Sequence, residues 1–160
     1  MSGEQIRIRA AVPADAPRLA ELLRSIGWFT QINEESEAST RANVLAQLNR
    51  CLADSSHTIS VAETSQGELV GYVSVHWLPY LLHSAPEGYV SELFIHESAR
   101  GQGIGTHLLN SVVEEARALG CYRLMLVNMR TRESYQRDFY KKLGWEERPE
   151  AANFVYYLTD

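Results

Sequence analysis

The sequence has few of the features that mark disulfide-rich, membrane or nucleic-acid-binding proteins. Its two cysteines, Cys51 and Cys121, are too few for a disulfide framework and lack the C-x-x-C spacing of a zinc or redox site. The longest mainly apolar stretch, residues 73–82, is too short to span a membrane, and the first residues lack the hydrophobic core of a signal peptide. Positive charge is not in excess, because 15 Lys and Arg stand against 20 Asp and Glu. We therefore expect a cytoplasmic protein that binds neither membranes nor nucleic acid.

Histidine is present, but not in a metal-binding arrangement. The five histidines follow no metal-ligand spacing, so no metal site is predicted. With 45% hydrophobic and 22% charged residues, the composition is that of an ordinary globular protein. A chain of 160 residues is long enough to bury one hydrophobic core, and neither a linker nor a repeat interrupts it. We expect a single domain that spans residues 1–160.

The periodicity of the apolar residues predicts a mixture of strands and helices. Alternation or short apolar runs predict strands at residues 5–10, 58–63, 69–77, 89–95, 123–127 and 153–158. Helical spacing predicts helices at residues 13–26, 44–52, 104–119 and 133–143. The second and third strands flank a turn that contains Gly67, which indicates an antiparallel hairpin. This order predicts an α/β (α+β) sheet covered by helices on both faces.

A glycine-rich turn, Arg100-Gly101-Gln102-Gly103-Ile104-Gly105, lies between the strand at 89–95 and the helix at 104–119. The first amides of a helix are unpaired and its N-terminus carries partial positive charge, so this turn is suited to hold an anion such as a pyrophosphate. A dinucleotide-binding fingerprint would need glycine where this sequence has Thr106. The simpler alternative is that the glycines only allow a tight strand-to-helix turn.

Residues 90–109, V-S-E-L-F-I-H-E-S-A-R-G-Q-G-I-G-T-H-L-L, closely resemble the coenzyme A binding motif of the GNAT family of N-acetyltransferases. The family signature is Arg or Gln, two residues, Gly, one residue, then Gly or Ala, and Arg100, Gly103 and Gly105 match it. Residues 138–145, D-F-Y-K-K-L-G-W, resemble the aromatic-Tyr-x-Lys-x-Gly-aromatic segment of the same family. The resemblance covers nearly the whole chain. It implies a mostly antiparallel central sheet of six to seven strands, flanked by about four helices and splayed between its fourth and fifth strands.

The resemblance also implies an enzyme, an acetyl-CoA-dependent N-acetyltransferase, and a place for its coenzyme. The backbone of the strand at 89–95 would pair with the pantetheine arm, and the amides of the glycine turn would hold the diphosphate. Lys142 would lie near a coenzyme phosphate, or would be a solvated lysine at a helix end. The implied coenzyme-binding residues are Leu93, Phe94, Ile95, Arg100, Gly101, Gln102, Gly103, Ile104, Gly105, Thr106 and Lys142.

Acetyl transfer to an amine requires a base, because an alkylamine with a pKa of about 10 is mostly protonated at neutral pH. Glu92, an acidic residue in an apolar strand on the same face as Phe94, is the predicted base, acting directly or through water. The alternative is a carboxylate bound structurally by arginine or by backbone amides. Tyr140 matches the family's acid, which protonates the leaving thiolate, and it could also anchor its helix. A backbone amide near Leu93 or Phe94 would stabilise the charge on the acetyl oxygen.

One part of the second motif differs from the family pattern. Many relatives have Asn seven residues before the tyrosine and Ala four residues before it, whereas this sequence has Glu133 and Gln136. Ser134 or Asn128 could replace the contact that this Asn makes with the pantetheine arm.

In the family, the acceptor binds opposite the coenzyme, over the first helices and the loop after the third strand. The residues expected there are Trp28, Phe29, His76, Tyr80 and His83. Such an aromatic lining suits the amine of a small molecule. A peptide N-terminus or lysine remains a competing acceptor, and a non-catalytic acetyl-CoA sensor remains a competing function. A homodimer through sheet edges or helices is left open.

Overall fold

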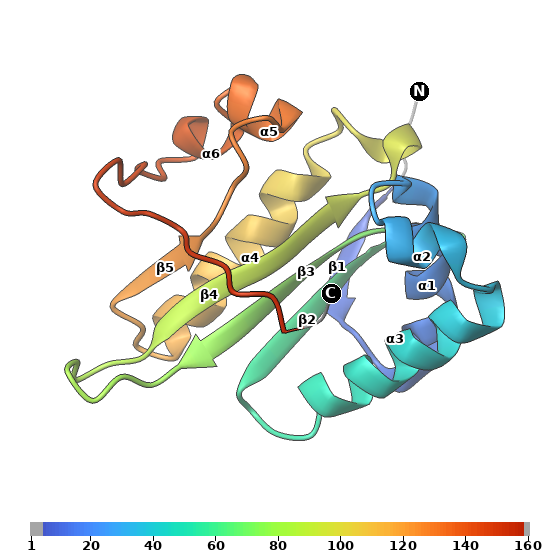
Figure 1. Ribbon diagram of the computed structural model, residues 1–160, viewed down its shortest axis with the longest axis horizontal. Coiled ribbons are helices and arrows are strands. Elements are labelled where there is room, and N and C mark those ends of the chain that lie inside the picture. Colours follow the sequence, from blue (N-terminus) through green and yellow to red (C-terminus); the bar gives the residue numbers. More distant parts are fainter. Residues whose placement is uncertain (1–4, 159–160) are drawn as a thin grey trace. The chain divides into compact units, whose positions relative to one another are not determined.

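A computed structural model describes residues 5–158 (Figure 1). Contacts within the chain divide it into two compact units, residues 1–127 and residues 128–160. The first unit holds the β-sheet and its covering helices, and the second holds two short helices and an irregular C-terminal segment.

The first unit contains one sheet with the strand order β1-β2-β3-β4-β5. The strands are β1 (Arg7–Ala10), β2 (His57–Glu63), β3 (Leu69–Leu78), β4 (Glu87–Ile95) and β5 (Arg123–Leu126). All neighbouring strands are antiparallel except β4 and β5, which are parallel. Five of the predicted strands are therefore confirmed, with shifts of one or two residues at their ends. The expected count of six to seven strands is not reached.

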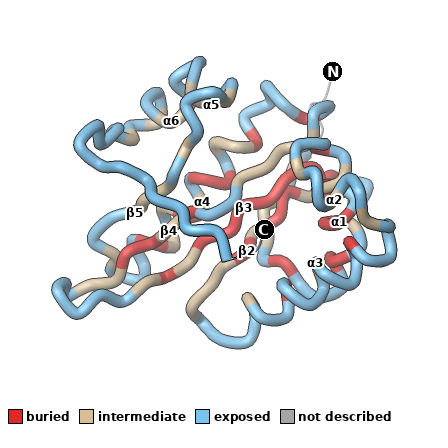
Figure 2. The backbone as a smooth tube through the Cα atoms, in the orientation of Figure 1, coloured by how far each residue is buried: buried red, intermediate tan, exposed pale blue. Residues whose placement is uncertain are grey.

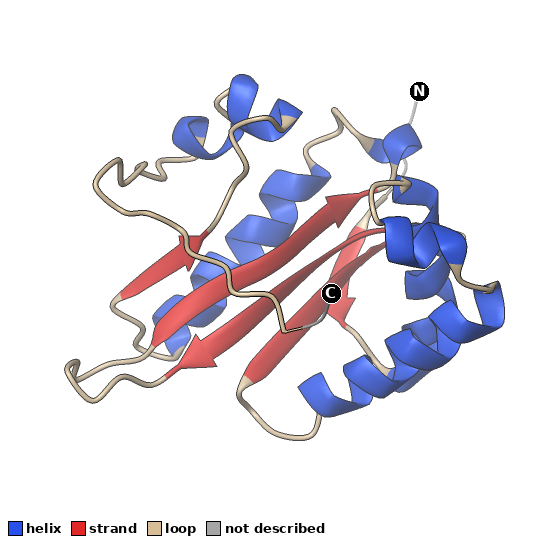
Figure 3. Cartoon of the chain, in the orientation of Figure 1, coloured by secondary structure: helices blue, strands red, loops and turns tan. Residues whose placement is uncertain are grey.

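Helices cover both faces of this sheet (Figures 1 and 3). They are α1 (Ala16–Ile26), α2 (Thr30–Glu34), α3 (Glu37–Cys51) and α4 (Ile104–Ala118), with one-turn 3-10 helices at Pro13–Asp15 and Glu97–Ala99. α1 and α3 form a hydrophobic core with Val61 and Tyr72. The residue before Tyr72 in β3, Gly71, faces the other side and lies against Leu108 of α4. Buried residues accordingly concentrate on the central strands between these layers (Figure 2).

The helix predicted at 13–26 is confirmed, whereas the helix predicted at 44–52 begins seven residues earlier, at Glu37. Ser36 begins α3, because its Oγ accepts a hydrogen bond from the Ser39 amide at 3.1 Å. This residue lies in the polar stretch that precedes the predicted helix. The short helix α2 was not predicted, because five residues are too few to show a helical period.

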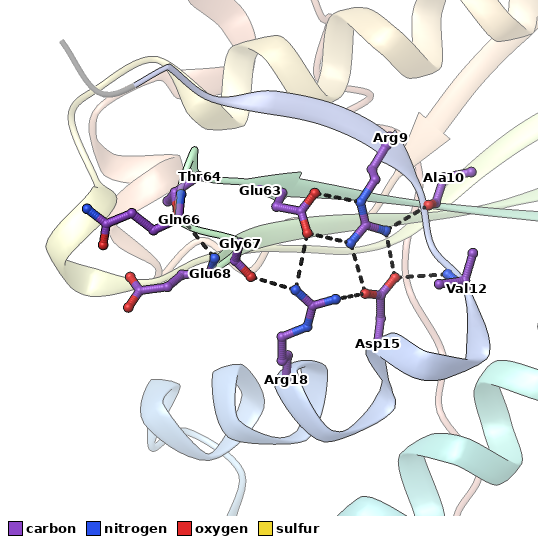
Figure 4. A network of polar contacts seen from close by, with 10 residues as sticks. All are labelled: Arg9, Ala10, Val12, Asp15, Arg18, Glu63, Thr64, Gln66, Gly67 and Glu68. Atoms are coloured by element: carbon purple, nitrogen blue, oxygen red, sulfur yellow. Dashed lines mark hydrogen bonds and ion pairs between the residues drawn. The ribbon is translucent and has the colours of Figure 1, made fainter. Parts of the chain in front are cut away.

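Four charged side chains tie β1, β2 and the start of α1 together (Figure 4). Arg9 donates two hydrogen bonds to Asp15, at 2.8 and 2.9 Å, and two to Glu63, both at 2.8 Å. Arg18 also donates to Asp15 at 2.5 Å and to Glu63 at 3.1 Å. The bonds from Arg9 lower the pKa of Asp15, which is fully buried, and lower the pKa of Glu63 to about 2. Both carboxylates are therefore ionised at neutral pH and stabilise the fold.

The second unit departs from the sequence predictions in two places. A single helix was predicted at 133–143, but Asp138 has a left-handed conformation with a φ of 55° and separates α5 (Glu133–Gln136) from α6 (Phe139–Lys142). The strand predicted at 153–158 is also wrong, since the described residues of this unit form no strand. Residues 154–158 are between 62% and 90% exposed. Their aromatic and β-branched side chains favour a strand only where a neighbouring strand pairs with them.

Candidate active site

A β-bulge in β4 changes the side-chain alternation in the middle of the sheet. In the register of β3 and β4, Val75 is opposite Val90 and Ser74 is opposite Glu92, which leaves Ser91 as an extra residue. An extra residue in one strand breaks the strict alternation of faces. Ser91 and Glu92 therefore both present their side chains to the face that α1 and α3 cover farther along.

β4 is paired on both sides along only half of its length. β5 pairs with residues 87–90, whereas β3 pairs with β4 as far as Ile95. Residues 91–95 consequently have one edge without a strand partner in the sheet. Backbone groups on such an edge can pair with an extended ligand. Leu93 and Phe94, whose backbone was expected to bind the coenzyme, lie on this segment together with Ile95.

The glycine turn leads from this segment into α4. Gly101 and Gly103 have φ values of +76° and +78°, in the left-handed region that favours glycine. Gly103 is the N-cap of α4, and its carbonyl accepts the hydrogen bond of the His107 amide at 3.0 Å. The amides of residues 104–106 therefore have no acceptor within the helix. Together with the positive end of the 15-residue helix, these amides can bind an anion.

Two polar side chains of the turn are engaged within it. Arg100 donates from Nε to the Ile95 carbonyl at 3.2 Å, and its guanidinium carbon lies 5.7 Å from the centre of the Trp28 ring. Gln102 donates from Nε2 to the Ser98 carbonyl at 3.3 Å. Gln102 can consequently contribute to a coenzyme site mainly through its backbone.

Glu92 follows the bulge and has no cationic partner. Glu92 is exposed, yet enough protein surrounds its carboxyl that desolvation raises the pKa, while a hydrogen bond from Tyr72 lowers it to a lesser extent. Burial is the main cause that raises the pKa values of Cys51 and Tyr72, and the charge of Glu92 is the second cause. These three groups therefore lie near each other. Among the described residues, no ion pair involves Glu92, which argues against a carboxylate held by arginine.

Four aromatic rings gather beside Glu92. Phe94, two residues farther along the same face, meets Phe29 edge to face at 5.3 Å and Trp28 at 6.1 Å between ring centroids. Tyr72 lies 5.9 Å from Phe94. The cluster reaches the surface, because Trp28 is 46% exposed. The structure thus brings two residues of the expected acceptor site, Trp28 and Phe29, against Phe94, two residues from the expected base.

Tyr80 and His83 lie elsewhere, at the opposite end of β4. Tyr80 donates its hydroxyl proton to Glu87 at 3.2 Å, and the His83 ring lies 4.3 Å from that of Tyr122. Glu87 is fully buried and also accepts a hydrogen bond from Tyr122 at 2.9 Å. A strand rises about 3.3 Å per residue, so Glu87 is on the order of 15 Å from Glu92. Tyr80 and His83 were expected to join the acceptor site but do not join the aromatic cluster there.

His76, the remaining residue of the expected acceptor site, lies between these two regions. Its Nε2 is 2.9 Å from the Ser91 Oγ, and its ring centroid is 4.2 Å from that of His57. Neither Ser91 nor His57 was expected at the site, and nor was Tyr72. Their positions depend on strand register and on the bulge, which local periodicity does not reveal.

In the second unit, the expected acid, Tyr140, is half-buried on α6. Burial raises its pKa, so its hydroxyl is protonated at neutral pH and can donate a proton. Its ring lies 6.0 Å from that of Trp145. Ser134 donates from Oγ to Asn128 Oδ1 at 3.1 Å, so the two candidates to replace the family's Asn bind each other. Lys142 is exposed.

Along residues 5–158, no helix combines the length and the apolar character needed to cross a membrane. Within the same range, no three His, Cys, Asp or Glu side chains are grouped so that they could hold a metal ion.

Comparisons with known proteins agree with this arrangement. The model of the acetyltransferase (GNAT) family matches residues 21–145. The chain is 25% identical over 154 residues to thialysine N-epsilon-acetyltransferase of Bos taurus, which covers 93% of this chain and 89% of the relative. It is 31% identical over 150 residues to glucosamine 6-phosphate N-acetyltransferase 1 of Oryza sativa subsp. japonica, covering 91% and 84%. The crystal structure of a transcriptional regulator from Bacillus halodurans C-125 superposes with a TM-score of 0.81 at 25% identity, covering 95% of this chain and 100% of that chain. The chain therefore belongs to the GNAT family of acetyltransferases and is an acyltransferase.

Proposed function

We propose that this enzyme transfers the acetyl group of acetyl-CoA directly to the primary amine of a small molecule. The observation that carries the proposal is the environment of Glu92. This carboxylate has no cationic partner among the described residues, its pKa is raised by burial, and it lies beside four aromatic rings. It also lies in the half of β4 whose second edge is unpaired. A base, an ammonium-binding surface and a backbone edge for an extended ligand thus meet on one strand.

The residues around the open edge fit the chemistry of acetyl-CoA. Amide groups of a pantetheine arm can pair with the backbone of Leu93, Phe94 and Ile95 as an added strand would. A diphosphate suits the free amides of residues 104–106 and the positive end of α4. The resemblance assigns a phosphate contact to Lys142, which is exposed and therefore free to reach a ligand. When bound, acetyl-CoA supplies the thioester that is attacked.

Each chemical step has a residue suited to it. Glu92, directly or through a water molecule, removes a proton from the ammonium group of the acceptor, and the neutral amine forms a C–N bond with the acetyl carbonyl carbon. A backbone amide near Leu93 or Phe94 on the open edge stabilises the negative charge on the acetyl oxygen. Tyr140 donates its hydroxyl proton to the thiolate that leaves when the C–S bond breaks.

The small-molecule acceptor is favoured by the aromatic cluster and by the relatives. An ammonium group is attracted both by aromatic rings and by a carboxylate, and Phe94 and Glu92 lie two residues apart on the same face of β4. The two curated relatives described above are named for thialysine and for glucosamine 6-phosphate, which are small molecules with a primary amine.

Thiol release from acetyl-CoA tests the proposal across small amines, polyamines, amino acids, aminoglycosides and peptide N-termini, with wild type and Tyr140→Phe in parallel. We expect an amine-dependent release of thiol that is reduced in Tyr140→Phe, while the affinity for acetyl-CoA stays unchanged. Release with peptides but not with small amines would replace the proposed acceptor. Absence of acetyl-CoA binding would overturn the proposal, and binding without release for any acceptor would favour a sensor.

A further inference from the structure

Four polar side chains, called the file below, lie in a row on the same face of the sheet as Glu92 and have no part in the function proposed above. They are Ser91, His76, His57 and Ser56. His57 on β2 and His76 on β3 are directly opposite each other, with ring centroids 4.2 Å apart and an angle of 64° between the rings. Nε2 of His76 lies 2.9 Å from Ser91 Oγ, and Nδ1 of His57 lies 2.8 Å from Ser56 Oγ. These contacts run without a gap from the β4 bulge to the loop before β2. Both histidines are partly exposed, so the file reaches solvent.

The bulge brings this file next to Glu92. Glu92 is opposite Ser74 on β3, and His76 is two residues farther along that strand on the same face. His76 and Glu92 are therefore diagonal neighbours across the strand pair, at a spacing of about 7 Å. A single water molecule, or the amine of an acceptor, can bridge two polar groups at this spacing.

Ser91 links His76 to the backbone of β3. Its Oγ lies 2.9 Å from His76 Nε2 and 3.4 Å from the Ser74 carbonyl oxygen, and its one hydroxyl proton can be donated to either. In both arrangements one ring nitrogen of a neutral His76 carries no proton. Burial, and to a lesser extent the neighbouring His57, lowers the pKa of His76, so its ring is neutral at pH 7. A neutral ring with a free nitrogen can accept a proton.

The groups around the file do not compete for this proton. Tyr89 on β4 lies 6.2 Å from His76 between ring centroids, and the pKa values of Tyr72 on β3 and Cys51 at the end of α3 are raised, so these two stay neutral at pH 7. At the surface end, the exposed Asp54 interacts with His57, and a hydrogen bond from Ser56 lowers the pKa of Asp54. Ordinary pKa values of 4.5 and 6.5 favour transfer from Glu92 to His76, and burial narrows this difference because it raises the pKa of Glu92 and lowers that of His76.

We propose that His76, positioned by Ser91, is a second proton acceptor in the transfer reaction and restores Glu92 to its ionised form. This role rests on the proposed function, because it requires Glu92 to act as the base. First, an N–H bond of the ammonium breaks and an O–H bond forms on Glu92, which leaves the amine neutral. The proton of Glu92 then passes through one water molecule to the ring nitrogen of His76 that carries no proton, giving a carboxylate and an imidazolium. The imidazolium releases a proton to solvent on the side of His57.

The test compares two acceptors in the intact protein. One is an alkylamine, which is protonated at neutral pH, and the other is an alkoxyamine or aromatic amine, which is already neutral and needs no base before attack. His76→Gln keeps a hydrogen-bonding side chain but cannot carry the proton. We expect it to lower kcat/KM for the alkylamine about tenfold or more, and to leave kcat/KM for the neutral amine and the affinity for acetyl-CoA unchanged. Added imidazole should restore the alkylamine rate of His76→Gln.

The outcomes separate this proposal from the proposed function. Equal losses with both amines, or a rise of the acceptor KM alone, would mean that His76 has a structural or binding role and would overturn the relay. If Glu92→Gln lowers alkylamine transfer while His76→Gln does not, the proposed function stands and the relay fails. A wild-type protein that binds acetyl-CoA but acetylates neither amine would overturn both.

Discussion

Two acidic regions of the same sheet differ in what surrounds their carboxylates. Where β1 meets β2, Asp15 and Glu63 share the guanidinium groups of Arg9 and Arg18, and the pKa values of both carboxylates are lowered (Figure 4). On β4, Glu92 has no cationic partner among the described residues, and burial raises its pKa. The first pair stays ionised and stabilises the fold, whereas Glu92 takes up a proton at a higher pH than an ordinary glutamate. The neighbours, and not the residue type, separate a structural carboxylate from a candidate catalytic one.

Removing the charge of Glu92 should have the largest effect. We expect Glu92→Gln to lower kcat/KM for an alkylamine by about 10²–10⁴-fold, the usual contribution of a general base. The free energy of unfolding should stay the same or rise, because burial disfavours the ionised form of this carboxylate. Steady-state kinetics and denaturant unfolding measure the two quantities. Glu63→Gln is the matched control and should keep kcat/KM in the folded fraction. An unchanged kcat/KM in Glu92→Gln would show that another group is the base.

Removing the charge of Asp15 should lower the free energy of unfolding and leave the activity unchanged, the reverse of the effects expected for Glu92. Asp15→Asn leaves two guanidinium groups without one of their carboxylates in a fully buried position, which should lower the free energy of unfolding by about 3 kcal/mol. The activity of the folded protein should not change. Denaturant unfolding gives the loss, and Arg41→Ala provides the control. The pair of Arg41 and Glu21 is exposed, so that substitution should cost no more than about 1 kcal/mol. A similar cost for both variants would mean that the buried network adds no more than a surface ion pair.

The two regions should also respond to pH with opposite signs. Asp15 and Glu63 have lowered pKa values, so their stabilising contribution is complete above the ordinary values of 3.8 and 4.5. It is lost as the pH falls through the folded-state values, which for Glu63 is about 2. Glu92 has a raised pKa, so its protonated form favours folding below 4.5, and this contribution is lost as the pH rises through the raised value.

Unfolding of wild type, Asp15→Asn and Glu92→Gln between pH 7 and pH 2 measures this difference. The stability advantage of wild type over Asp15→Asn should be constant from pH 7 to about pH 5 and shrink toward pH 2. The stability of wild type relative to Glu92→Gln should instead increase on acidification, mostly before pH 4 is reached. If both differences changed in the same direction, the contrast between the two regions would be wrong.

The strands and main helices of the first unit could be predicted because burial leaves a pattern in the sequence. The helices show one apolar stripe, whereas residues 69–77 form a short apolar run since α1 and α3 cover one face of the sheet and α4 the other. The break at Asp138 could not be predicted, because a positive φ at a non-glycine residue leaves no trace in the apolar spacing. Residues 153–158 have the composition of a strand but no partner strand in their unit, and composition alone does not supply one.

The candidate site could be predicted only in part. The family motif placed Glu92 on β4, and Trp28 and Phe29 contact Phe94, two residues farther along that strand. Tyr80 and His83 lie in the loop after β3, where the acceptor site was expected. A hydrogen bond from Tyr80 to Glu87 and a ring contact of His83 with Tyr122 hold them at the other end of β4. The bulge depends on the pairing of two strands, and no pattern within either strand reveals it. The contacts of the coenzyme stay a prediction.

The smallest effect is expected from two glycine substitutions, which compare a glycine in a structural turn with one in the proposed coenzyme site. Gly67 in the β2–β3 turn and Gly103 before α4 have φ values of +83° and +78°, and no atom lies within 4 Å of a Cβ built at either position. Alanine at either position should therefore cost about 1 kcal/mol of stability through backbone strain alone. Only Gly103→Ala should also weaken acetyl-CoA binding, since a shift of this turn moves the free amides of α4. Calorimetric titration of both variants with acetyl-CoA measures this difference. Equal affinities would mean that the turn holds the chain's conformation and not the diphosphate.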